Sequence, residues 1–179
     1  MFNRLLKRLQ PPPLEDPALN IQARNTFAIL FAAFVLTTLY LFYTFWFPPY
    51  WQIAVAVIAL GAEIGLWFLL QKGQVVLTGT ILTILLWLAI VIEVSLYGGV
   101  RDTGFAAFVI VIVIASLTMG VRGSIVFAVL TILAGAGMVI AEMNGALPPR
   151  VEVQAYAALL SHVITIGAVV ALLSLAIRS

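Results

Sequence analysis

The sequence lacks cysteine, has a single histidine and carries few charged residues. Without cysteine, the chain has no disulfide, no thiolate metal site and no thiol nucleophile. Charged residues make up 9% of the 179 residues, whereas an average soluble domain has about 25%. So few charges cannot coat a water-soluble globule. This excludes a soluble enzyme domain and a nucleic-acid-binding module, and the net charge of +2 requires no nucleic-acid partner.

Apolar residues make up 64% of the chain and form six long runs bounded by proline, glycine or charged residues. The runs cover about residues 26–47, 51–70, 75–96, 105–119, 124–143 and 153–177. Backbone groups in hydrocarbon must be hydrogen-bonded within the segment or within a closed barrel, and barrel strands alternate in polarity. These runs are uniformly apolar. The sequence therefore predicts an all-α integral membrane protein, a bundle of six transmembrane helices at residues 25–179, preceded by a basic tail at residues 1–24.

The positions of the cations predict how the helices are oriented. Most lysines and arginines fall on one side of the membrane: Arg4, Lys7, Arg8, Arg24, Lys72, Arg122 and Arg178. Arg101 and Arg150 fall on the other side. Because cytoplasmic loops are enriched in lysine and arginine, both termini are expected in the cytoplasm of a bacterial inner membrane.

The first ten residues have their own pattern. Phe2, Leu5, Leu6 and Leu9 repeat with helical spacing, and the basic residues lie on the opposite side. This pattern predicts either a short helix lying on the inner leaflet or a frayed basic tail.

Ionisable residues inside membrane spans are costly and are candidates for function. Glu63 and His162 are predicted at similar depths in the second and sixth spans, and Glu93 and Glu142 lie nearer the outer surface. Together with Arg101 they would form a polar track opening outward, and Glu63, Glu93, His162 and Arg101 are the predicted ligand-binding residues. The alternatives are that a protonated Glu63 only links helices, and that Glu93 and Glu142 only reach the interface.

The sequence gives little support for a bound metal, haem or retinal, or for a catalytic site. One histidine excludes a haem with two histidine ligands, and the scattered carboxylates lack metal-ligand spacing. Lys72 lies in a turn and is not the buried lysine that retinal needs. There is no zinc motif, phosphate-binding loop or nucleophile elbow. The sequence therefore predicts no metal, no cofactor and no enzyme activity.

Small and aromatic residues in the spans predict helix packing. Gly61 and Gly65 form a GxxxG pattern around Glu63, which predicts either close packing within the chain or a dimer contact. Trp67 and Trp87 are interpreted as core or interface residues.

Several short stretches together are typical of one family. They are Arg24-Asn25, Lys72-Gly73-Gln74-Val75, Trp87, Gly98-Gly99-Val100-Arg101, Leu117-Thr118-Met119-Gly120-Val121-Arg122-Gly123 and Leu147-Pro148-Pro149. The chain resembles the six-helix N-terminal membrane region that precedes GAF, PAS and kinase modules in some bacterial sensor histidine kinases. Related regions precede cyclic-dinucleotide enzymes. The family pattern identifies no ligand-binding residue, so the resemblance assigns none to this sequence.

The resemblance implies a sensory module of a two-component or related signal-transduction system. The resemblance also implies a homodimer in which the last membrane helix continues into a cytoplasmic coiled coil. The kinase core is not in these residues, and His162 lies within a predicted span, so it is not a phospho-acceptor candidate. We therefore expect the sixth helix to carry the output to a cytoplasmic signalling domain or partner protein. The alternatives are a structural subunit of a larger membrane complex and a small transporter or channel.

Overall fold

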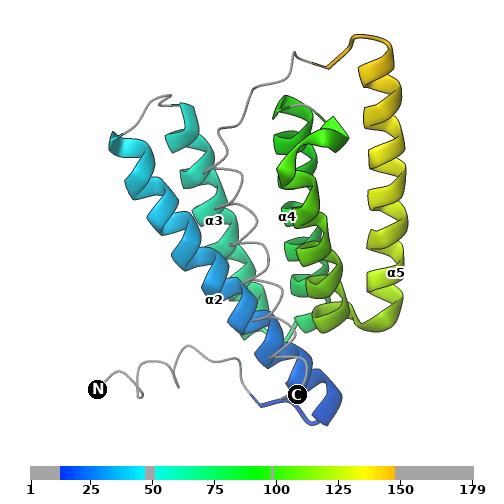
Figure 1. The fold of residues 1–179 in the computed structure, drawn as a ribbon. Coiled ribbons are helices and arrows are strands. Elements are labelled where there is room, and N and C mark those ends of the chain that lie inside the picture. The colour runs from blue at the N-terminus through cyan, green and yellow to red at the C-terminus, as the bar shows by residue number, and fades with distance from the viewer. Residues whose placement is uncertain (1–12, 47–50, 98, 148–179) are drawn as a thin grey trace. The chain divides into compact units, whose positions relative to one another are not determined.

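The computed structural model of the chain describes residues 13–46, 51–97 and 99–147, and every element in these ranges is helical (Figure 1). Four helices are long and apolar enough to cross a membrane: Pro17–Trp46, Gln52–Gln71, Val75–Tyr97 and Gly104–Met143. The all-α architecture expected from the sequence is thus found in the described residues, with four helices that could cross a membrane rather than the six that were predicted. The sixth predicted span and the amphipathic segment at residues 1–10 lie outside them.

The chain divides into two compact units, Met1–Leu82 and Thr83–Ser179. In the first unit, α2 (Pro17–Trp46) and α3 (Trp51–Gln71) pack against each other as a helical hairpin. Residues near the start of α2 meet residues near the end of α3, so the two helices are antiparallel. Pro48 and Pro49, which bound the first apolar run, follow the last helical residue Trp46 after one intervening residue.

Helix α2 begins at Pro17, about nine residues before the predicted start at Thr26. The Oδ1 atom of Asp16 accepts a hydrogen bond from the backbone N–H of Ala18 at 2.8 Å. Aspartate is a preferred N-cap, and proline is favoured at the first helical position because its missing N–H would have no partner there. The helix therefore starts inside the segment that the sequence assigned to the tail.

The turn between α3 and α4 (Val75–Tyr97) closes the base of the first unit. Gly73 adopts a positive φ of 76°, which is the left-handed conformation typical of a residue that ends a helix. Ala23, Leu70 and Val75 form a buried cluster beside this turn, and Leu14 packs against it. The segment before α2 is thus held by the same cluster that joins α3 to α4.

The second unit contains most of α4, two short 3-10 helices and α5. The 3-10 helices are η1 (Gly99–Arg101) and η2 (Thr103–Ala107), and α5 is Phe108–Met143. Asp102 caps η2 by accepting a hydrogen bond from the backbone N–H of Gly104. Helix α5 is broken at Gly120, where φ is 76° and ψ is −171°. We call residues 108–119 the first arm and residues 121–143 the second arm.

The two arms of α5 form a tight antiparallel hairpin (Figure 1). Residues that meet lie at similar distances on either side of Gly120. A Cβ added to Gly123 would lie 2.5 Å from Met119 Cβ and 3.1 Å from the Ala115 carbonyl, and one added to Gly135 would lie 3.2 Å from Phe105 Cζ. The predicted fourth and fifth runs are therefore two helical arms of one hairpin, folded back at the glycine-rich turn between them.

The first arm alone spans about 18 Å, which is short of the roughly 30 Å hydrocarbon core. Helix η2 lengthens it, because Ala107 and Phe108 both have right-handed helical dihedrals and join η2 to α5 without a break. Five residues of 3-10 helix add about 10 Å. Together η2 and the first arm reach about the thickness of the bilayer core.

The core of the second unit lies where α4 meets both arms. Val94, Phe108 and Met138 form its centre, one residue from each of the three segments. Phe108 also packs against Trp87, with ring centroids 6.3 Å apart, and against Phe105 at 5.1 Å. This confirms the interpretation of Trp87 as a core residue.

Two polar contacts join helices within this core. The indole Nε1–H of Trp87 donates to Thr131 Oγ1 at 3.2 Å. The hydroxyls of Thr83 and Thr118 approach to 3.5 Å. Threonine hydroxyls are common at membrane helix interfaces, where their small size allows close approach.

Replacing Trp87 with phenylalanine should lower the free energy of unfolding by about 0.6 kcal/mol through the lost hydrogen bond, in addition to the effect of the smaller ring. The coupling is measured with Thr131→Val in a double-mutant cycle, using unfolding in mixed detergent micelles. We expect a coupling between the two sites. Purely additive effects would show that the indole N–H contributes nothing to stability.

Candidate ligand-binding site

Glu63 lies near the middle of α3. It is about 18 Å along the helix from Trp51 and about 12 Å from Gln71, which places it deep in the hydrocarbon if α3 spans the membrane. Its side chain is half-buried. An ionisable group at this depth needs a polar partner on a neighbouring helix.

Thr37 on α2 supplies that partner. Its hydroxyl donates to Glu63 Oε1 at 2.8 Å, which links the two helices of the first unit. The second oxygen, Oε2, is buried and has no hydrogen-bond partner in the part of the chain that the structure describes. The contact fits the predicted helix-linking role of Glu63, and it leaves one carboxyl oxygen for another partner.

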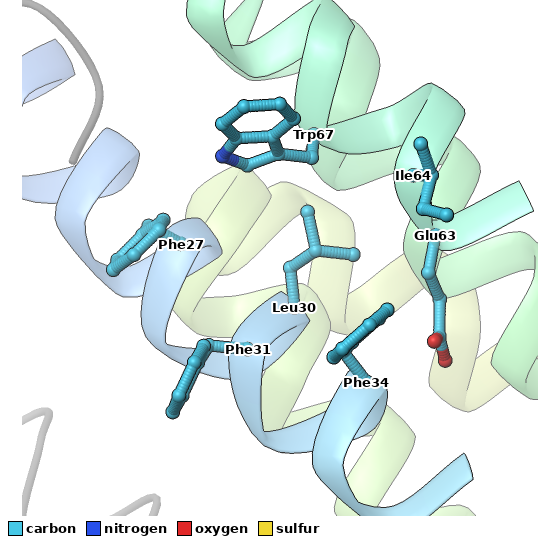
Figure 2. Close-up of a pocket in the computed structure, with 7 residues that line it drawn as sticks. All are labelled: Phe27, Leu30, Phe31, Phe34, Glu63, Ile64 and Trp67. Carbon is cyan, nitrogen blue, oxygen red and sulfur yellow. The ribbon is translucent and has the colours of Figure 1, made fainter. Parts of the chain in front are cut away.

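A cleft of about 250 Å³ lies beside this carboxyl group, between α2 and α3 (Figure 2). Glu63 is the one ionisable residue in its lining, and the other side chains are aromatic or aliphatic. They are Phe27, Leu30, Phe31, Phe34, Ile64 and Trp67. Pockets that combine an apolar lining with a few polar groups are typical of small-molecule sites.

The spacing of the lining residues follows from helix geometry. Phe27, Phe31 and Phe34 are separated by four and three residues and therefore share one face of α2. Glu63 and Trp67 are four residues apart and share one face of α3. Phe27 and Phe31 stack with their ring centroids 6.2 Å apart. Because the two faces oppose each other, the cleft combines aromatic rings from both helices.

The other predicted site residues lie elsewhere in the chain. Glu93 is exposed near the end of α4, and Glu142 is exposed near the end of α5, both in the second unit. Arg101 is the last residue of η1. His162 lies outside the described residues. The structure thus places Glu63 in a cleft of its own, and the shared outward track with Glu93, His162 and Arg101 stays a prediction.

Gly61 and Gly65 lie on a face of α3 that α2 does not cover. Nothing in the described part of the chain lies within 4 Å of a Cβ added at either position. Both residues are exposed. Because α2 contacts a different face of α3, the packing partner of these glycines, within the chain or in a dimer, stays a prediction.

Thr37 and the phenylalanines of α2 were not among the residues that the sequence singled out. An ionisable group stands out within an apolar run, whereas a threonine in a span is common. The helical spacing of Phe27, Phe31 and Phe34 was the available signal. Such a stripe of phenylalanines usually faces lipid or packs in a helix core. Only the position of Glu63 on the opposing helix shows that these phenylalanines line a cleft.

No group of three or more metal-ligating side chains gathers within residues 13–46, 51–97 and 99–147. No family model matches the chain, and no curated protein or solved structure matches it.

Proposed function

We propose that the chain is the membrane-embedded sensory module of a bacterial signal-transduction protein. The observation that supports this proposal is the hydrogen bond between Thr37 and Glu63. It lies beside an aromatic cleft within an apolar helical hairpin. A ligand that bound this carboxyl group would interact differently with states in which α2 and α3 are arranged differently. Such a differential interaction is what a ligand needs in order to shift a conformational equilibrium.

The proposed module lies in the bacterial inner membrane as a homodimer, with both termini in the cytoplasm. The predicted sixth helix would carry the change in packing to a cytoplasmic signalling domain or partner protein. The resemblance to the membrane regions of sensor histidine kinases supports this arrangement, and so does the excess of cations in the predicted cytoplasmic turns.

The sensory role is tested by joining a histidine kinase module after Ser179 and measuring its autophosphorylation in membranes. Glu63→Gln and His162→Ala are expected to change the basal activity or the response to added compounds. Glu15→Gln is the matched control, because Glu15 is exposed and lies before α2. The same kinase output from both test variants as from the unmodified fusion would remove these residues from the mechanism.

The topology is tested with single cysteines, which the natural sequence lacks. Lys72 and Arg122 are exposed in the structure and are predicted to face the cytoplasm. Lys72→Cys and Arg122→Cys should resist a membrane-impermeant thiol reagent in intact cells and react after lysis. Ala146→Cys, which follows the second arm of α5, should react in intact cells. The opposite labelling pattern would invert the orientation.

Transport has less support than sensing. Transporter sites near the midplane usually involve helices that break within the membrane. In the described residues, the break at Gly120 instead joins two arms that lie against each other, so it is the turn of a hairpin. Saturable uptake of a solute into liposomes that contain the chain would overturn this preference.

A further inference from the structure

We propose that the cleft between α2 and α3 binds a small organic cation with an apolar body, and that Glu63 is its counter-ion. The simplest such ligand is a quaternary ammonium that carries one aromatic ring. This inference deepens the proposed function by naming the class of ligand, and the binding itself requires no output domain.

The carboxyl group sets the charge of the ligand. Thr37 donates to Oε1, whereas Oε2 is buried without a partner in the described residues. The remaining lining side chains supply no hydrogen-bond acceptor for a protonated Oε2. They also supply no cation for an ionised Oε2. A positively charged ligand in the cleft would provide the missing partner once the Glu63 side chain turns this buried oxygen toward the cleft, since a carboxylate in an apolar site is stable only when it is paired.

The aromatic rings support the same choice. Figure 2 shows three phenylalanines projecting from α2 and Trp67 projecting from α3 around the cleft. The faces of such rings attract a cation that lies within about 6 Å of the ring centroid, and tryptophan does so most strongly. A purely apolar ligand would gain nothing from the carboxyl group. A small hydrophilic cation would gain little from the apolar wall.

The size and depth of the cleft restrict the ligand further. A cavity of roughly 150 Å³ holds one benzene molecule, so a cleft of about 250 Å³ accommodates one ring with a compact ammonium group. Glu63 lies more than about 10 Å along α3 from either end of the helix. The cationic headgroup of a lipid resides at the membrane surface, so a free amphipathic cation fits this depth better than a headgroup does.

The proposal is tested by direct binding of radiolabelled benzyltrimethylammonium to the purified 179-residue chain in detergent micelles. Neopentylbenzene is the matched neutral competitor, because a carbon atom replaces the nitrogen without a change of shape. Binding of the cation should be saturable, and excess unlabelled cation should displace it while neopentylbenzene should not. The Glu63→Gln variant should bind at least about tenfold more weakly, because it retains the size of the side chain and loses its charge.

Two further variants separate binding from folding. Phe34→Leu keeps an apolar side chain of similar bulk and removes an aromatic face, so we expect binding to weaken about two- to thirtyfold. Glu15→Gln removes a carboxylate outside the cleft and should bind like the unmodified chain. The helical content of each variant is measured by circular dichroism, so that a loss of binding counts only in a folded variant.

Three results would overturn the proposal. They are no saturable binding of the cation, unchanged binding by folded Glu63→Gln, and equal displacement by the neutral isostere. Equal displacement would identify an apolar cleft that accepts a lipid tail instead. If the cation binds but no variant alters the output of the kinase fusion, the sensory function fails and the binding site stands. If Glu63→Gln alters the output without any cation binding, the reverse holds.

Discussion

Replacing Gly120 with alanine is expected to lower the free energy of unfolding by about 1–3 kcal/mol. Gly120 combines a φ of 76° with a ψ of −171°, a region of backbone conformation that is essentially restricted to glycine. A Cβ added there would meet no atom within 4 Å. The expected loss therefore comes from backbone strain alone. It is measured as the shift in detergent-induced unfolding followed by circular dichroism.

Gly137→Ala is the matched control for this prediction. Gly137 lies in the second arm of α5, and a Cβ added there also meets nothing within 4 Å. Alanine is favoured over glycine in a helix, so this variant should be neutral or slightly more stable. If Gly120→Ala unfolds at the same detergent concentration as the unmodified chain, the arms are joined by a conformation that alanine also adopts.

Replacing Phe108 with alanine should have a comparable effect through packing. Phe108 is 2% exposed and packs in one buried cluster with Val94 of α4 and Met138 of the second arm. In water-soluble proteins such a truncation costs about 3–5 kcal/mol. Part of that cost is the transfer of apolar surface to water, which is absent when the unfolded helices stay in lipid. We therefore expect a loss of about 1–3 kcal/mol, mainly from the cavity.

The control for Phe108 is a phenylalanine on the outer surface. Phe42 is 64% exposed in the described structure, so Phe42→Ala should change the unfolding free energy by less than about 0.5 kcal/mol. Both variants are compared in the same mixed micelles. Equal effects of the two substitutions would mean that Phe108 is not at the centre of a packed core.

The runs of apolar residues predicted most of the described helices closely, because their length and uniformity reflect the thickness of a bilayer. The start of α2 was missed by about nine residues, since Asp16 and Pro17 extend the helix beyond its apolar portion. The run at residues 105–119 was identified as a span, but its first residues form the 3-10 helix η2. Composition does not distinguish 3-10 from α-helical geometry.

The candidate site could be predicted only in part. Glu63 was identified because a carboxyl group within an apolar run is costly and conspicuous. Thr37 and the stripe of phenylalanines were missed, because their importance depends on which face of α2 meets α3. The partner of the GxxxG pattern could not be predicted for the same reason, since Gly61 and Gly65 lie on a face of α3 that α2 does not cover.

The amino-acid sequence by itself determined the surroundings of this protein, because a chain with so few charges and such long apolar runs is stable only as helices in lipid. It also determined where the chain turns, because glycine and charge interrupt the runs. Only the tertiary structure decided which helix faces meet, since helices that are apolar all round carry no pattern that selects a partner face. That choice brought Thr37 to Glu63 and formed the aromatic cleft beside them.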